Sequence, residues 1–303
     1  MSAERAAFRH EHPLLFAGLV LAGLGTVFWL GTVLTVGWAV GRISGPDLFV
    51  SAGVGVVEIS GPIAVADEVI ETLRSFRADE AVRAVVLRID SPGGAVGAAQ
   101  EIFAEARRTD AVKPVIASLA SVAASGGYYV ALGARRIVAN PGTLTGSIGV
   151  IARFPDLSEL FAKIGYRSDV VKSGELKDLG SSDRPLSARE RAVLQHVLDD
   201  VHAQFIGAVA ERRGLDRAVV EPLADGRVFS GREAKELGLV DELGNFSDAI
   251  RAAAQEAGLE EDDPDLIYPA SDEFDFTRLL AGQAGRWFFG LGRRLPAPAY
   301  LLP

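Results

Sequence analysis

Serine and glycine residues gather at three turns that follow apolar runs of this 303-residue chain. The turns are Gly93–Gly94, Ser125–Gly127 and Gly146–Gly149. Glycine lets a substrate backbone approach closely, and the N–H groups at the start of a helix suit an anion. Two such turns brought together could form an oxyanion hole beside a serine nucleophile, Ser125. The alternative for each turn is a tight strand–helix connection that does no chemistry.

A serine nucleophile needs a base, and the four histidines are poorly placed for that role. His10 and His12 precede a long uncharged run, and His196 and His202 belong to a helical pattern. A Ser-His-Asp triad is therefore not favoured. The sequence has no cysteine, no zinc-ligand spacing and no phosphate-binding glycine loop. It predicts neither a metal nor a cofactor.

Lysine is the remaining candidate for the base, because burial or a cationic neighbour can bring a lysine pKa towards neutrality. Arginine stays protonated and cannot take this role. The lysines of the chain are Lys113, Lys163, Lys172, Lys177 and Lys235. Lys172 and Lys177 lie in "VVKSGELKDLG", which we interpret as a strand that runs into a glycine-containing loop. On the residues alone, either lysine is a candidate base or a solvated charge.

The composition fits a protein with a sizeable core and no nucleic-acid surface. Hydrophobic residues make up 49% of the chain, and its net charge is −9, whereas nucleic-acid binders usually present a basic face. Strand-like runs occur at 54–63, 82–90, 113–120, 135–140 and 145–151, and helical patterns occur at 65–76 and 95–108. This alternation predicts an α/β fold with largely parallel sheets.

The second half of the chain continues the alternation. A helix is expected at 156–165, a strand at 166–174 and a last strand at 266–269. Ser187–Arg213 has the pattern of one long amphipathic helix, and Ser187 with Glu190 has the form of a capping box at its start.

An uncharged segment near the N-terminus predicts a membrane anchor. Residues 14–40 contain no charge, and about 20 apolar residues suffice to cross the hydrocarbon core. We therefore expect a transmembrane anchor at 14–41, after an N-terminal segment 1–13 and before a linker 42–52. The alternative is a cleaved signal peptide, whose apolar region is usually shorter, about 7–15 residues.

The arginines beside this segment favour one orientation. Arg5 and Arg9 precede it and Arg42 follows it, so the positive-inside rule weakly favours a cytoplasmic N-terminus. The residues after Arg42 would then lie outside the cytoplasm. The C-terminal tail, 271–303, is basic and aromatic, which fits a helix lying on a membrane surface or a docked helix with exposed arginines.

Five motifs occur along the chain in a specific order: "RIDSPGG", "ASGGYYVA", "TLTGSIGV", "VKSGELKDLG" and "DGRVFSGREAKELGLVDELG". With them the chain resembles the signal peptide peptidase A family, the membrane-anchored Ser-Lys peptidases of bacteria, in its short single-repeat form. The resemblance extends from about Val54 to Ala249. The last motif is less specific, because related crotonase-fold enzymes carry similar segments.

The resemblance implies roles for five residues. Ser125 corresponds to the nucleophile, and Lys177 corresponds to the general base. Ser147 corresponds to a serine that orients the lysine. The N–H groups of Gly94 and Gly126 correspond to the oxyanion hole.

The resemblance also implies an architecture and a setting. The fold would be a crotonase/Clp-protease-like α/β spiral of repeated β-β-α units, with a peptidase domain at 53–270. A homo-oligomeric ring or dome would bring the serine and the lysine together across a subunit interface. The protein would be a single-pass protein of the bacterial inner membrane with an extracytoplasmic catalytic domain. Its substrates would be residual signal peptides and other apolar or unfolded chains.

Three alternative functions remain open from the sequence. A crotonase-type acyl-CoA enzyme would use only the oxyanion hole, without a nucleophile. A non-catalytic membrane scaffold would keep the fold without turnover. A peptidase of the same family could act on a dedicated membrane protein.

Overall fold

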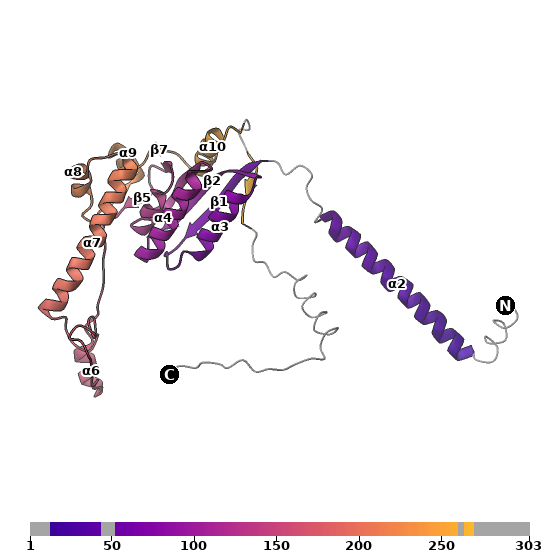
Figure 1. The fold of residues 1–303 in the computed structure, drawn as a ribbon, viewed down its shortest axis with the longest axis horizontal. Coiled ribbons are helices and arrows are strands. Elements are labelled where there is room, and N and C mark those ends of the chain that lie inside the picture. The colour runs from indigo at the N-terminus through magenta and orange to yellow at the C-terminus, as the bar shows by residue number, and fades with distance from the viewer. Residues whose placement is uncertain (1–12, 44–51, 260–263, 270–303) are drawn as a thin grey trace. The chain divides into compact units, whose positions relative to one another are not determined.

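The computed structural model describes residues 13–43, 52–259 and 264–269, which divide into two units. The first contains helix α2 (Pro13–Ile43), and the second contains the other described helices and strands (Figure 1). Within the described ranges, no helix is long and apolar enough to cross a membrane. The transmembrane anchor expected at 14–41 therefore stays a prediction. Residues 1–12 of the expected N-terminal segment, residues 44–51 of the expected linker and the C-terminal tail lie outside the described residues.

One sheet of eight strands organises the described part of the second unit. The strands are β1 (Gly53–Ser60), β2 (Val82–Ser91), β3 (Val115–Ala124), β4 (Arg136–Ala139), β5 (Leu144–Gly146), β6 (Val228–Ser230), β7 (Glu242–Leu243) and β8 (Leu266–Ile267). Their order is β6-β5-β3-β2-β1-β8, with β4 beside β3 and β7 beside β4. Every pair is parallel except β5 with β6.

Helices pack on both faces of this sheet. The described helices of this unit are α3 (Asp67–Ala78), α4 (Val96–Asp110), α5 (Gly126–Ala131), α6 (Ser158–Ile164), α7 (Ala188–Arg213), α8 (Arg217–Val220), the 3-10 helix η1 (Glu221–Leu223), α9 (Gly231–Glu236) and α10 (Phe246–Glu256). Of these, α6 lies apart from the sheet (Figure 1). Alternate residues of β2 divide between the faces: Val85 and Leu87 join the larger core, whereas Ala84 and Val86 pack with α10. Burial on both faces explains why β2 is a nearly continuous apolar run.

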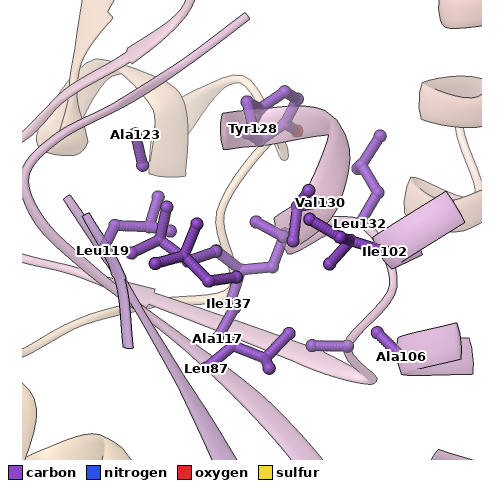
Figure 2. Close-up of a cluster of buried hydrophobic side chains, with 14 of the residues drawn as sticks. Leu87, Ile102, Ala106, Ala117, Leu119, Ala123, Tyr128, Val130, Leu132 and Ile137 are labelled. Atoms are coloured by element: carbon purple, nitrogen blue, oxygen red, sulfur yellow. The ribbon is translucent and has the colours of Figure 1, made fainter. Parts of the chain in front are cut away.

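The larger core fixes the start of α5. Leu87, Leu119 and Ile137 from the strands meet Ile102 of α4 and Tyr128 of α5 in one fully buried cluster (Figure 2). The Tyr128 hydroxyl donates a 2.7 Å hydrogen bond to the carbonyl oxygen of Leu239. Full burial of one large apolar side chain contributes about 1.5–3 kcal/mol, so this packing holds α5 firmly against the sheet.

The α/β class with a largely parallel sheet is confirmed, and so is the long helix at 187–213. Ser187 caps α7: its hydroxyl accepts a hydrogen bond from the Glu190 N–H, and the Glu190 carboxylate accepts one from the Ser187 N–H. The last strand is present as β8, although only Leu266 and Ile267 pair, in parallel with Val54 and Gly55.

Two expected strands differ from the structure. The strand predicted at 166–174 is wrong, because this segment is almost entirely exposed and meets no sheet edge; Val171 is fully exposed. The strand predicted at 145–151 is shorter and ends at Gly146, where the backbone turns to a positive φ of 77°. Both predictions rested on apolar residues, but a strand also needs a neighbouring strand to pair with, and residues 147–151 and 166–174 have none in the described part of the chain.

Candidate active site

Ser125 occupies the sharp turn between β3 and α5. Its backbone has φ 52° and ψ −119°, a conformation that costs a residue with a side chain about 1–3 kcal/mol. The Ser125 N–H donates to the Gly146 carbonyl oxygen at 2.8 Å, and its own carbonyl accepts from the Tyr129 N–H at 2.9 Å. A strained strand-to-helix turn also presents the nucleophilic serine of α/β-hydrolases.

Two backbone amides lie close together beside this turn. A β-carbon placed on Gly126 would lie 3.2 Å from the Gly94 nitrogen. Gly126 is the first residue of α5, where an N–H group has no acceptor within the helix. Gly94 forms an isolated β-bridge with Ile63. The hydrogen bonds of this bridge are donated by the N–H groups of Ile63 and Ala95, so the Gly94 N–H takes no part in it. The structure thus brings together the two amides expected to form the oxyanion hole.

The glycines before Ser125 are required by space. Gly93 has φ 96°, and a β-carbon there would lie 2.6 Å from the Gly126 nitrogen and 3.0 Å from the Ser125 β-carbon. A β-carbon on Gly94 would lie 2.0 Å from the Ile63 carbonyl oxygen. Neither clash can be relieved by moving a flexible side chain, since backbone atoms are involved.

Ser147 lies next to Ser125 across a strand pair. Ala124 of β3 is opposite Gly146 of β5, so the two serines follow the paired ends of neighbouring strands. Ser147 also has a positive φ, 50°, and its N–H donates to the Arg227 carbonyl oxygen at 2.8 Å. Among the described residues other than glycine, only these two serines have a positive φ.

A mainly apolar pocket opens beside Ser125. Its lining residues are Gly94, Val96, Ala99, Gln100, Ser125, Gly126, Tyr129, Gly149, Val150, Val201 and Phe205. The ring of Tyr129 packs against Phe103 at 5.1 Å and Phe205 at 4.9 Å between centroids. Burial raises the pKa of the Tyr129 hydroxyl, which is also hydrogen-bonded to Gln100, so this group stays protonated. Such a pocket suits a small or medium apolar side chain of a substrate.

The two neighbouring tyrosines therefore have different roles. The sequence interpretation assigned both to packing, which holds for Tyr128 in the core. Tyr129 instead contributes to the pocket wall. The signal that could have separated them is their position in α5, since adjacent residues of a helix point about 100° apart.

Lys177 lies in a different part of the unit. Residues 151–187, called the arm below, contain α6 and lie at the N-terminal end of α7, away from the sheet (Figure 1). Lys177 is exposed, and its N–H donates to the Gly174 carbonyl oxygen at 3.1 Å. No hydrogen bond within the described part of this chain joins Lys177 to Ser125 or Ser147. The structure brings four of the five expected site residues together and leaves the lysine apart.

Other candidate groups do not complete the site. His196 and His202 lie in α7 as expected, and neither bonds to Ser125 in the described ranges; the buried Nε2 of His202 has no hydrogen-bond partner there. His10 and His12 lie outside the described residues. The described ranges also contain no cluster of His, Cys, Asp or Glu that could hold a metal ion.

Comparisons with known proteins show similarity to a family of peptidases. The family model "Peptidase family S49" matches residues 107–260, about half of the chain. A candidate protease of Synechocystis sp., slr0021, is 43% identical over 213 residues, which cover 70% of this chain and 76% of that protein. The chloroplastic serine protease SPPA of Arabidopsis thaliana is 36% identical over 73% of this chain. Protease 4 of Salmonella typhi is 39% identical over 64% of this chain.

The relatives differ in length. The chain spans 34% of the Arabidopsis protein and 32% of the Salmonella protein, against three quarters of slr0021. The matched part includes Ser125, Ser147 and Lys177, all of which lie within 107–260.

Proposed function

Because this chain belongs to peptidase family S49 and is a serine peptidase, we propose that it cleaves peptide bonds with a Ser125–Lys177 dyad through an acyl-enzyme. The observation that supports this most strongly is the Ser125 turn, where a strained serine lies beside the amides of Gly94 and Gly126. Family membership also removes the reason to prefer an acyl-CoA enzyme or a scaffold without turnover.

The first half of the reaction forms an ester. Neutral Lys177 accepts the Ser125 hydroxyl proton, and the Ser125 oxygen attacks the substrate carbonyl carbon. The N–H groups of Gly94 and Gly126 stabilise the oxyanion that develops. Protonated Lys177 then gives its proton to the departing amine, the C–N bond breaks, and the acyl group remains on Ser125.

The second half of the reaction restores the enzyme. Lys177 accepts a proton from water, and the resulting hydroxide attacks the ester carbonyl. The acid product leaves when the Ser125 oxygen takes the proton back from Lys177. Ser147 orients the lysine through a hydrogen bond. Because both halves need a neutral lysine, activity falls as the pH is lowered.

The dyad forms between two copies of the chain. Within one chain Ser125 and Ser147 share a site, while Lys177 is displayed on the exposed arm. A homo-oligomer in which the arm of one copy reaches the Ser125 pocket of the next completes the site. A heterologous contact of this type closes into a ring or dome. The fold proposed for each copy in this assembly is a crotonase-like spiral of repeated β-β-α units.

The substrates are residual signal peptides and other apolar or unfolded peptides. The apolar pocket beside Ser125 supports this choice. A dedicated membrane-protein substrate is the second candidate, because the same pocket would accept an apolar segment of such a protein. Attachment to the bacterial inner membrane through residues 14–41 rests on the uncharged sequence of that segment. The placement of the peptidase domain outside the cytoplasm rests on the arginines that flank it.

Active-site labelling with a fluorophosphonate probe tests the dyad. Wild type, Ser125→Ala, Lys177→Ala and Lys177→Arg are compared for probe labelling and for hydrolysis of an apolar peptide. All three variants should lose hydrolysis. Ser125→Ala lacks the nucleophile, Lys177→Ala lacks the base, and the arginine of Lys177→Arg cannot act as a base. The matched control is Lys163→Ala, which removes another lysine of the arm and should keep full activity.

Assembled and dissociated wild type are labelled in the same experiment. Labelling should require the assembled form. Hydrolysis that persists in Ser125→Ala or Lys177→Ala would overturn the dyad, and full labelling of the dissociated chain would overturn the shared site.

A further inference from the structure

A chain of ion pairs runs from the Lys177 loop to the start of α7. Lys172 bonds through its Nζ to the Asp178 carboxylate and donates to the Glu175 carbonyl oxygen at 2.8 Å. Arg184 approaches the other oxygen of Asp178 at 2.9 Å. Asp178 therefore has a cation on each oxygen. It is the residue directly after Lys177, so any movement of Asp178 moves the lysine.

Arg184 also joins this loop to the helix. Its Nη1 and Nη2 donate to the two carboxylate oxygens of Glu190 at 2.8 and 2.6 Å, a bidentate pair. Bidentate arginine–carboxylate pairs fix orientation as well as distance. The Glu190 side chain is only 3% exposed, which is unusual for an acidic residue in an otherwise exposed region.

Glu190 is in turn fixed to the backbone of α7. Its carboxylate accepts a hydrogen bond from the Ser187 N–H at 2.8 Å, which completes the capping box of the helix. The hydrogen bonds from Arg184 and Ser187 hold the pKa of Glu190 well below its ordinary value, and those from Lys172 and Arg184 lower the pKa of Asp178. Both groups stay ionised at neutral pH, so the chain of ion pairs is intact there.

The second half of α7 contributes to the Ser125 pocket. Val201 and Phe205 line that pocket, and Phe205 is buried against the core. The same helix therefore connects the wall of one chain's own pocket to the loop that carries its lysine. Asp178, Arg184 and Glu190, called the clamp below, are the link between that helix and the lysine.

We propose that the clamp positions Lys177 for catalysis, so that Asp178, Arg184 and Glu190 are positioning residues for the base. This inference rests on the proposed function, because it assumes that Lys177 is the base. The clamp fixes the backbone at Lys177 by holding the next side chain. It also engages the Asp178 carboxylate with two cations, Lys172 and Arg184, so this carboxylate does not hold the Lys177 side chain in an ion pair.

Two variants test the clamp while preserving the helix. Glu190→Gln keeps a side chain that can complete the capping box but loses the ion pair with Arg184. Arg184→Lys keeps the charge but cannot bond bidentately to Glu190 while holding Asp178. We expect kcat to fall about 10–100-fold in both, since small misplacements of a catalytic group have effects of this size. KM should change little, because neither residue touches the pocket.

The matched control is the ion pair between Arg189 and Glu175. It also joins the arm to α7, at 2.6 Å, but its side chains are 65% and 67% exposed. Exposed pairs contribute little, so Arg189→Gln should keep wild-type kcat. The assembled fraction of each variant is isolated and assayed alone, so that lost assembly is not counted as lost catalysis.

A second readout separates positioning from general stability. In the Lys177→Ala background, Glu190→Gln should cause no further loss in the rate of probe labelling at Ser125, because residues that act through one group are not additive. The clamp is overturned if both clamp variants keep wild-type kcat while Lys177→Ala is inactive, or if Glu190→Gln lowers labelling further in that background. If Lys177→Ala itself stays active, the proposed dyad has failed instead.

Discussion

The turn that carries Ser125 and the arm that carries Lys177 are held by different forces. Around Ser125, glycines let backbone segments approach closely, and the buried side chains of α5 fix the turn against the sheet. Around Lys177, the side chains are mostly exposed, and ion pairs replace apolar packing. A nucleophile and an oxyanion hole must keep a fixed mutual geometry, which suits a rigid core. A base supplied to a second copy must instead be displayed on the surface.

Mixing two inactive variants gives the largest expected effect. Ser125→Ala keeps the lysine and Lys177→Ala keeps the serine, so a mixed assembly contains some complete sites. Random mixing in a ring should restore about a quarter of the sites from a starting activity near zero. Peptide hydrolysis after joint refolding or co-expression measures this. Each variant assembled alone is the control, and a mixture that stays inactive would mean that the dyad forms within one chain.

A methyl group at Gly93 should damage the turn that carries Ser125. Gly93→Ala places a β-carbon 2.6 Å from the Gly126 nitrogen at a φ of 96°. We expect at least a roughly 100-fold loss of activity and a loss of about 1–3 kcal/mol in the free energy of unfolding. Gly97→Ala in α4 is the matched control, because nothing lies within 4 Å of its β-carbon. There the free energy of unfolding should rise slightly, and an equal loss at both positions would contradict this account.

Acid should loosen the clamp. The pKa values of Asp178 and Glu190 are lowered in the folded chain by hydrogen bonds from Lys172 and Arg184. A lowered carboxyl pKa stabilises the fold fully above the unfolded-state pKa, about 4 for these groups, and this contribution is lost progressively as the pH falls from there through the lower folded-state pKa. Limited proteolysis should therefore cut the arm faster at about pH 3–4, close to these unfolded-state pKa values, than at pH 7. The digestion in acid uses a protease that is active there. Glu190→Gln should make the cutting at neutral pH resemble that of the wild type in acid. Unchanged cutting across this range would contradict the role given to the ion pairs.

The smallest effect separates strain from chemistry at Ser125. Ser125→Gly and Ser125→Ala should both be inactive, but glycine relieves the positive φ of 52°. The glycine variant should therefore be more stable than the alanine variant by about 1 kcal/mol in denaturant unfolding. At Ser173 of the arm, which has no positive φ, the same pair of substitutions should show the opposite order. A more stable alanine variant at Ser125 would mean that the turn is not strained.

The sequence predicted the core side of the molecule well. The run 82–90 is largely apolar on both faces, a pattern typical of a parallel strand buried on both sides. The capping box of Ser187 and Glu190 uses contacts three residues apart, so local sequence was enough to find it. Ser125, Gly94 and Gly126 were found as turn residues at strand ends, and the family resemblance supplied their roles.

The arm was harder to predict for a physical reason. Its apolar residues, such as Val170 and Val171, are exposed in the single chain, so their pattern does not report on burial within it. The segment was therefore mistaken for a strand. The clamp escaped notice as well, because an ion pair between Arg184 and two different carboxylates depends on how the loop folds. Tyr129 was missed because composition does not say which side of α5 faces the pocket.

The length of α7 has a mechanical consequence. The helix has 26 residues, or about 39 Å, and its buried contacts other than Glu190 begin at Phe205. The part before Phe205 is a lever about 26 Å long. A tilt of about 5° at Phe205 would move the start of the helix by about 2 Å, which is enough to break a hydrogen bond. The accuracy with which the arm is aimed therefore depends on how Phe205 packs against Tyr129, at the opposite end of the lever.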